Sequence, residues 1–355
     1  MLIGLLSNKT DRRAAMVPAT VAKLIKAEHE LWFEAGLGAR AYFDDKDYQA
    51  AGAAAKPRAE ILKGANLIVC IEPPSEAEIK TIPAETYLIG MFNPLVDTAL
   101  AERLSAQGLK AFSLDRIPRT TIAQSMDVLS SMASLAGYRA VLAGANALPS
   151  YFPMLMTAAG TIPPAKVLIL GAGVAGLQAI ATARRLGAQV EAFDVRAAAK
   201  EEVLSLGAKF VEVAGSTDDT SAGGYAVEQT EAYQQRQKEL IHEHAAKADV
   251  IITTANIPGR KAPLLVEERT VMAMKPGSVI VDLAAVTGGN CALTEDGKTV
   301  VANGVSIIGN SHLAAEMSSD ASRLYSNNVF NFFSHVFREA EINPEDEITA
   351  GTLIQ

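Results

Sequence analysis

The chain has 355 residues, of which 49% are hydrophobic and 20% are charged. This composition is typical of globular proteins, and the length predicts two domains rather than one. The formal net charge of -8 argues against a polyanionic partner, because phosphate contacts need clustered Lys and Arg side chains. We therefore expect no nucleic acid partner.

In the first third of the chain, short apolar runs alternate with amphipathic helical patterns. The predicted strands are Leu2–Leu6, Leu67–Ile71, Tyr87–Phe92 and Lys110–Ser113, and helical spacing marks Thr20–Ala27 and Asp97–Ala106. Such alternation predicts a parallel α/β sheet. Residues 123–148 then form a helical pattern long enough to link two domains.

Residues 140–165 form the longest stretch without a charged side chain, which raises the question of a membrane span. Four prolines argue against it, because they would leave backbone groups unpaired in lipid. We expect two short buried segments and a turn instead, with no direct membrane insertion. No signal peptide is recognised, and two cysteines are too few for a disulfide framework, so the expected location is cytoplasmic.

A second α/β series follows. Its predicted strands are Lys166–Leu170, Gln189–Phe193, Phe210–Val213, Val250–Thr253, Ser278–Val281 and Val305–Ile308, and its first helices are Val174–Leu186 and Ala197–Leu206. Residues 214–224 lack a core-facing pattern and are expected to form a long surface loop, a kind that often acts as a lid. The helical pattern 321–337 has an apolar face that we expect to pack on the first domain, formed by Leu324, Val329, Phe330, Phe333 and Val336.

The sequence Gly171-Ala-Gly173-Val-Ala-Gly176 has the pattern G-x-G-x-x-G between a predicted strand and a predicted helix. Gly171 permits the tight turn, Gly173 lets a pyrophosphate approach the backbone, and Gly176 lets the helix pack on the strand. The pyrophosphate would sit at the helix N-terminus, where N–H groups and the helix dipole favour negative charge. The alternative is a glycine-rich turn without a ligand.

Asp194 ends the next predicted strand, at the offset of roughly 20 residues expected of the acid that binds the adenosine ribose. Its carboxylate would accept hydrogen bonds from the ribose hydroxyls and repel a 2′-phosphate, which predicts NAD(H) as cofactor. Arg196 leaves NADP as an alternative, since an arginine can meet that phosphate. Otherwise we expect Arg196 to be a solvated cation at a helix start.

Other kinds of site find little support. The five histidines do not lie with cysteines or carboxylates at metal-ligand spacing, so no metal is expected. No G-x-S-x-G motif supports hydrolase chemistry. Four methionines, Met126, Met132, Met154 and Met156, are expected to fill the core.

A polar group precedes the long helix, with Arg119, Gln124, Ser125 and Asp127 close in sequence. In one interpretation Asp127 and Ser125 cap the helix. In the other, an arginine, an amide and a carboxylate at a domain junction hold a nicotinamide carboxamide. Both interpretations stay open.

We therefore predict an α/β fold with two Rossmann-like parallel-sheet domains, separated by a cleft and joined by long helices. The first domain comprises residues 1–125 and is completed by 311–355. Residues 126–148 form the linking helix, and 149–310 form the Rossmann NAD-binding domain.

Several longer runs carry a family resemblance. They are Ala123–Asp127, Leu135–Ala140, Thr157–Gly160, Pro163–Val167, Gly171–Gly176, Ala222–Ala226, Thr253–Ala255 with Ile257–Gly259, and Lys275–Leu283. With them the sequence resembles the soluble NAD(H)-binding domain, or alpha subunit, of proton-translocating transhydrogenases, and more distantly alanine dehydrogenase. The resemblance implies hydride transfer from NADH to NADP⁺ held by an NADP(H)-binding partner subunit or domain. Proton movement would pass through a membrane-spanning partner subunit. It also implies a homodimer, held peripherally at the inner membrane through these partners.

The resemblance also implies roles for single residues. Those matched to the nicotinamide are Arg119, Gln124, Asp127 and Ser130, together with Ser125 and Met126 between them. Val174, Ala175 and Gly176 match pyrophosphate contacts, while Asp194, Val195 and Arg196 match contacts on the ribose and adenine side. Gly224, Tyr225 and Ala255 match a mobile loop and a strand end that enclose the adenosine.

Three positions depart from alanine dehydrogenases, which carry a substrate-binding lysine, a catalytic histidine and a catalytic aspartate where this chain has Cys70, Met91 and Val286. Arg13 still matches their carboxylate-binding arginine, and Asn256 replaces a residue that is usually apolar. These departures favour a transhydrogenase component over an amino-acid dehydrogenase. A non-catalytic NAD sensor is the third alternative, against which the retained Arg119, Gln124 and Asp127 argue.

Overall fold

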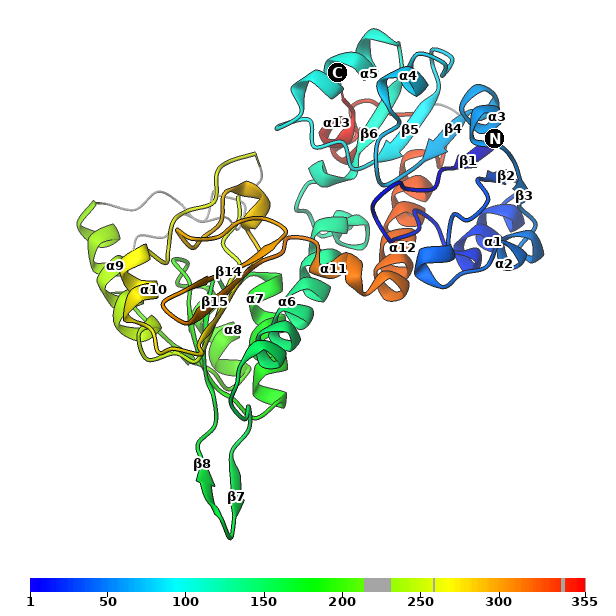
Figure 1. The fold of residues 1–355 in the computed structure, drawn as a ribbon. Helices are drawn as coiled ribbons and strands as arrows, with labels where there is room; N and C mark the ends of the chain where they lie inside the picture. The colour runs from blue at the N-terminus through cyan, green and yellow to red at the C-terminus, as the bar shows by residue number, and fades with distance from the viewer. Residues whose placement is uncertain (214–230, 258, 340–341, 355) are drawn as a thin grey trace. The chain divides into compact units, whose positions relative to one another are not determined.

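A computed structural model describes residues 1–213, 231–257, 259–339 and 342–354 (Figure 1). The chain divides into two compact units: unit 1 comprises residues 1–132 and 315–355, and unit 2 comprises residues 133–314. Each is built on a largely parallel sheet with helices between the strands, which confirms the predicted α/β class. The loop predicted at 214–224 lies outside the described residues.

The sheet of unit 1 has the strand order β3-β2-β1-β4-β5-β6, and all neighbouring strands are parallel. The strands are β1 Leu2–Leu5, β2 Glu30–Phe33, β3 Ala54–Ala55, β4 Leu67–Val69, β5 Tyr87–Gly90 and β6 Lys110–Ser113. The four predicted strands are present. Strands β2 and β3 were not predicted, because runs of four and two residues are too short to show a pattern.

The helices of unit 1 are α1 Pro18–Lys26, α2 Asp45–Ala50, α3 Arg58–Gly64, α4 Glu76–Ile79, α5 Thr98–Ala106, α12 Ser318–Val336 and α13 Glu347–Thr352. The 3-10 turns are η1 Ala39–Ala41, η2 Leu114–Arg116 and η3 Ile122–Met126. Helix α12 buries Tyr325, Val329 and Val336 in unit 1. The prediction for Leu324 is wrong, because this side chain precedes Tyr325 by one residue and so points about 100° away from the buried stripe, into solvent.

The sheet of unit 2 has the order β11-β10-β9-β12-β13-β15-β14, in which β14 alone is antiparallel. The strands are β9 Lys166–Leu170, β10 Gln189–Phe193, β11 Lys209–Phe210, β12 Val250–Thr253, β13 Val279–Asp282, β14 Lys298–Ala302 and β15 Val305–Gly309. The helices are α6 Val128–Ala147, which begins in unit 1, α7 Val174–Arg185, α8 Ala199–Ser205, α9 Glu231–Ala245 and α10 Glu268–Ala273, with a 3-10 turn η5 Ala285–Thr287. The chain returns to unit 1 within α11 Leu313–Glu316.

The prediction of two buried segments and a turn within residues 140–165 is wrong. Strands β7 Leu155–Thr157 and β8 Gly160–Ile162 form an antiparallel hairpin that projects from unit 2 (Figure 1). Met154 and Met156 are 57% and 73% exposed, so they are not core residues, whereas Met126 and Met132 are buried as predicted. The two strands pair each other's backbone groups, so the hairpin forms without a buried face.

Helix α6 is the only helix in the described ranges that is long and apolar enough to cross a membrane. Its glycines pack closely in unit 2. A Cβ at Gly137 would overlap the carbonyl oxygen of Ala175 in α7, and a Cβ at Gly144 would lie 2.9 Å from a methyl group of Val250 in β12. The glycines thus allow α6 to approach both α7 and the sheet.

The close approach at Gly137 is testable by a single methyl group. Ala is favoured over Gly in a helix by about 1 kcal/mol, so Gly137→Ala would stabilise an uncrowded helix. Here we expect it to destabilise the protein by about 1–3 kcal/mol, because the methyl group has no room. Urea unfolding followed by circular dichroism measures the change. The exposed Asn146→Ala on the same helix is the control, and a stabilised Gly137→Ala protein would contradict the packing.

Candidate functional site

The glycine turn lies between β9 and α7 at the carboxyl edge of the sheet of unit 2. Gly171 has φ +102°, a conformation that side-chain-bearing residues rarely adopt. A Cβ at Gly176 would overlap the carbonyl oxygen of Gly171, so the turn and the first turn of α7 are in contact. No atom lies within 4 Å of a Cβ at Gly173. That side of the turn is open, where the first N–H groups of α7 have no intrahelical acceptor and suit an anion.

Asp194 follows β10 and holds the glycine turn. Its Oδ2 accepts a hydrogen bond from the backbone N–H of Ala172 at 2.7 Å, and its Oδ1 accepts one from the N–H of Arg196 at 2.9 Å. The side chain is 7% exposed. The carboxylate is therefore fixed beside the turn, at the place expected from the sequence.

The expectation that Arg196 is a solvated cation is wrong. Its Nε donates to Oδ1 of Asp194 and its Nη2 donates to Oδ2, both at 2.9 Å. These hydrogen bonds raise the pKa of the Arg196 guanidinium above its ordinary value. The pairing arises because the backbone N–H of Arg196 already bonds to Asp194, which brings the guanidinium fork within reach of the carboxylate.

Ala255 lies after β12, next to the glycine turn, and its position depends on residues that the sequence did not single out. The hydroxyl of Thr254 donates to the carbonyl oxygen of Gly171 at 3.0 Å. Asn290 binds both backbone groups of Ala255: its Nδ2 donates to the carbonyl oxygen at 2.8 Å, and its Oδ1 accepts from the N–H at 3.1 Å. Nothing in the sequence marks Asn290, since its partner lies 35 positions away.

Asn290 is in turn held by Asp282, a fully buried residue at the end of β13. The Oδ2 of Asp282 accepts hydrogen bonds from the N–H groups of Asn290 at 2.7 Å and Cys291 at 3.0 Å, and from the hydroxyl of Thr294 at 2.7 Å. A carboxylate directly after an apolar strand is a signal that could have found Asp282. Asn256 is exposed, and its Oδ1 accepts a hydrogen bond from Thr287 at 3.2 Å.

The predicted residues of unit 2 thus gather around one turn. Those at the turn or bonded to its neighbours are Gly171, Gly173, Val174, Ala175, Gly176, Asp194, Arg196 and Ala255. Val195 is half-buried and packs on the apolar core beside the sheet. Gly224 and Tyr225 lie outside the described residues.

The predicted nicotinamide residues lie in unit 1, around the 3-10 turn η3. Asp127 caps α6: its Oδ1 accepts from the N–H of Ser130 at 2.9 Å and its Oδ2 from the hydroxyl of Ser130 at 2.5 Å. The capping interpretation therefore holds for Asp127, while Ser125 is held through its backbone. Its carbonyl oxygen accepts from Asn328 at 2.9 Å and Asn331 at 3.0 Å on α12. Gln124 and Arg119 are exposed.

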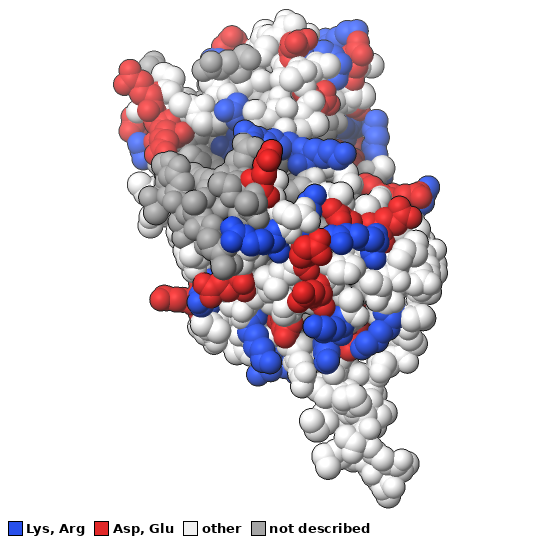
Figure 2. All heavy atoms as spheres, turned by 90° about the vertical axis from the view of Figure 1, so that its left-hand side faces the viewer, with Lys and Arg blue, Asp and Glu red and all other residues white. Residues whose placement is uncertain are grey.

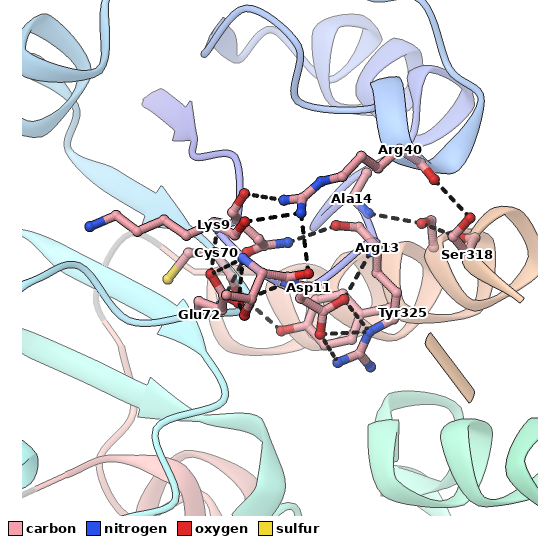
Figure 3. Close-up of polar contacts among 12 residues, drawn as sticks. Lys9, Asp11, Arg13, Ala14, Arg40, Cys70, Glu72, Ser318 and Tyr325 are labelled. Carbon is pink, nitrogen blue, oxygen red and sulfur yellow. Dashed lines mark hydrogen bonds and ion pairs between the residues drawn. The ribbon is translucent and has the colours of Figure 1, made fainter. Parts of the chain in front are cut away.

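Arg13, the remnant of a carboxylate site, is engaged within the chain (Figure 3). Its Nη2 donates to Oδ2 of Asp11 at 2.6 Å, and its guanidinium lies 5.8 Å from the centre of the buried Tyr325 ring. Glu72 fixes the loop by accepting the backbone N–H groups of residues 9–11. Burial raises the pKa of the neighbouring Cys70 thiol to about 12.

Residues 7–136 match the family domain described as "Alanine dehydrogenase/PNT, N-terminal domain", and residues 140–355 match "Alanine dehydrogenase/PNT, C-terminal domain". The chain belongs to the alanine dehydrogenase/PNT family. Membership implies binding of a nicotinamide nucleotide, for which the turn at Gly171 has the expected geometry.

Within this family the chain is most like transhydrogenase subunits, as the sequence indicated. An alpha-subunit protein of the NAD(P) transhydrogenase of Rhodospirillum rubrum is 44% identical over 97% of this chain and 93% of that protein. A transhydrogenase structure from Sinorhizobium meliloti has a TM-score of 0.91 at 42% identity, covering 99% of this chain and 98% of that one. An L-alanine dehydrogenase structure reaches 0.83 at 26% identity, covering 99% and 94%.

The hydrogen bonds of Asn290 suggest a sharp test of the site's framework. Asn290→Ala removes the partners of the Ala255 backbone and the Pro263 carbonyl oxygen. We expect a loss of about 1–3 kcal/mol in the free energy of unfolding, the cost of leaving buried polar groups unpaired. Asn256→Ala, an exposed asparagine next to Ala255, should change stability by less than about 0.5 kcal/mol. Equal effects of the two substitutions in urea unfolding would contradict the role of Asn290.

Proposed function

We propose that this chain is the NAD(H)-binding component of an NAD(P) transhydrogenase, which exchanges hydride between NADH and NADP⁺ held by a partner subunit. The observation that carries the proposal is the glycine turn fixed by Asp194, with an open side at the N-terminus of α7. The sequence offers one such turn, because the strand ending at Leu5 runs into Ser7-Asn-Lys-Thr-Asp-Arg12, which has no glycine. Transfer between two nicotinamides needs two sites, so the second belongs to a partner.

In this proposal the residues divide by the portion of NAD(H) that they hold. Gly171, Gly173, Val174, Ala175 and Gly176 bind the pyrophosphate through backbone N–H groups. On the adenosine side lie Asp194, Val195, Arg196 and Ala255, with Gly224 and Tyr225 from outside the described residues. The nicotinamide residues are Arg119, Gln124, Ser125, Met126, Asp127 and Ser130.

The nicotinamide ring supplies the hydride when it is bound, and the chain's task is to orient it. Gln124 is suited to this because it lies on η3, whose carbonyl at Ser125 is held by two asparagines of α12. A rigid turn presents the amide in a defined direction, and fixed orientation accounts for much of the rate in direct transfer. Asp127 acts through Ser130 and the helix start, so it is a positioning residue for the same turn.

The partners we propose are an NADP(H)-binding subunit or domain and a membrane-spanning proton-channel subunit. The chain itself would be cytoplasmic and attached to the inner membrane through them. Support comes from the relative's description as a subunit and from the packing of α6 within unit 2. An alanine dehydrogenase function is disfavoured, because a buried Cys70 and an exposed Val286 stand where the resemblance implies lysine and aspartate.

Cofactor preference follows from Asp194. We expect NADH to bind at least about 10-fold more tightly than NADPH, because a 2′-phosphate would be repelled by the carboxylate and has no hydrogen to donate to it. Calorimetric titration of both nucleotides gives the ratio. Equal affinities would remove Asp194 as the source of selectivity, and tighter NADPH binding would reverse the assignment.

Hydride transfer should require the partner. We expect the isolated chain to be nearly inert and to gain transhydrogenation when an NADP(H)-binding domain from a related enzyme is added, with reduction of a nicotinamide analogue as the readout. Gln124→Ala should slow transfer at saturating NADH by about 10-fold or more, while NADH binding changes little. Gln107→Ala is the control, since this residue donates to Ile82, away from η3. Rapid transfer by the chain alone, or none in the mixture, would overturn the proposal.

We also propose a homodimer, in which the β7–β8 hairpin contacts the second copy. The hairpin has no charged residue and exposes Met154, Met156 and Ile162, and Figure 2 shows it as an uncharged projection. Met156→Asp is expected to shift the protein from dimer to monomer in sedimentation at micromolar concentration. Met272→Asp, an exposed methionine on α10, should leave the dimer intact. An unchanged dimer in the hairpin variant would exclude this surface.

A further inference from the structure

The Asp194 carboxylate is saturated by hydrogen bonds from its own chain. A carboxylate offers about four lone-pair sites, two on each oxygen. Oδ1 accepts from the N–H and the Nε of Arg196, and Oδ2 accepts from the N–H of Ala172 and the Nη2 of Arg196. No site is left for the hydroxyls of a ribose.

Two of these four hydrogen bonds come from backbone groups, and two from the Arg196 side chain. The backbone bonds alone hold the carboxylate in place, one to each oxygen. The guanidinium is therefore not needed to position Asp194. Its side chain is 30% exposed against 7% for Asp194, so it lies on the solvent side of the pair, where a ligand would approach.

We infer that the Arg196 guanidinium stands in for the ribose hydroxyls before the nucleotide binds and leaves the Asp194 carboxylate when it does. The inference rests on the proposed function, because it concerns the adenosine end of that site. The exchange is balanced: two N–H donors of Arg196 are replaced by two O–H donors of the ribose. It makes Arg196 a residue that sets how much the ribose hydroxyls contribute to affinity, since each gained contact is offset by one that is lost.

Unit 1 contains the same arrangement away from the glycine turn. Asp11 Oδ1 accepts from the N–H of Arg13 at 2.8 Å and from its Nε at 3.0 Å, and Oδ2 accepts from Nη2 at 2.6 Å (Figure 3). The pairing of an aspartate with an arginine two residues on is therefore a local preference of this sequence pattern. No glycine turn is needed to form it, and Arg13 provides an internal reference for Arg196.

The decisive measurement compares ADP with 2′,3′-dideoxy-ADP, which lacks both ribose hydroxyls, by titration calorimetry. For the wild-type chain we expect the two ligands to differ by less than about 3-fold, because hydroxyl contacts replace the Arg196 contacts. In Arg196→Ala the carboxylate is unoccupied by the guanidinium, so the difference should rise to about 10-fold or more, the usual effect of a hydrogen bond to a charged group. Arg196→Lys, with a single ammonium donor group in place of the fork, should fall between.

Arg185→Ala is the matched control. Arg185 is exposed and ends α7, about 18 Å along the helix from the glycine turn, so it removes the same charge without touching Asp194. Its ratio should equal that of the wild type. A second readout is direct: the Nε–H nuclear magnetic resonance signal of Arg196 should shift on addition of ADP, while that of Arg13 should not.

The outcomes are separable. If ADP binds and the ratio is the same in wild type and Arg196→Ala, or falls, the guanidinium stays on Asp194 in the complex and the inference is wrong while the proposed function stands. An unchanged Arg196 signal at saturating ADP overturns it in the same way. If neither NADH nor ADP binds to the wild-type chain, both the proposed function and the inference are overturned. A raised ratio together with a shifted signal establishes the exchange.

Discussion

Backbone contact at the start of α7 is the constraint on which the candidate site depends. Gly176 lies against the carbonyl of Gly171, and Gly137 of α6 lies against the carbonyl of Ala175. Three segments thus meet with no side chain between them. A methyl group at either glycine would push α7 from the strand or from α6, and the helix N-terminus would no longer face the open side of the turn. The glycines here are required by space, and Gly171 by its φ as well.

The two units repeat one device with different outcomes. In unit 2, Asp194 after the second strand of the series accepts an N–H of the turn after the first. In unit 1, Glu34 after β2 likewise accepts the N–H of Ser7 after β1, at 2.9 Å. There the carboxylate is also paired with Arg58 at 2.9 Å, which bridges to Glu78. The loop after β1 has no glycine turn, so the same connection serves only to fix that loop, whereas in unit 2 it frames an open helix end.

The sequence predicted those elements of the fold that depend on local pattern. Buried parallel strands read as apolar runs, so β9, β10 and β12 were located to the residue. The hairpin β7–β8 was misjudged, because apolar composition alone does not tell a core segment from a strand pair that folds on itself in solvent. Side-chain partners were the hardest to predict. The fork between Arg196 and Asp194 depends on the direction of the chain after β10, and the clamp of Asn290 on Ala255 joins residues far apart in sequence.

The fork between Arg196 and Asp194 also bears on the rate at which a ligand arrives. An unpaired carboxylate beside the glycine turn would oppose the approach of an anionic pyrophosphate, since fixed charges act over roughly 8 Å at physiological salt. With the guanidinium held on it at 2.9 Å, the adenosine end of the site is locally neutral before binding. The approaching anion then meets mainly the partial positive charge at the start of α7. Association at this site is thereby limited by diffusion and orientation rather than by a charge barrier, and the repulsive carboxylate is uncovered only after the ligand has made contact.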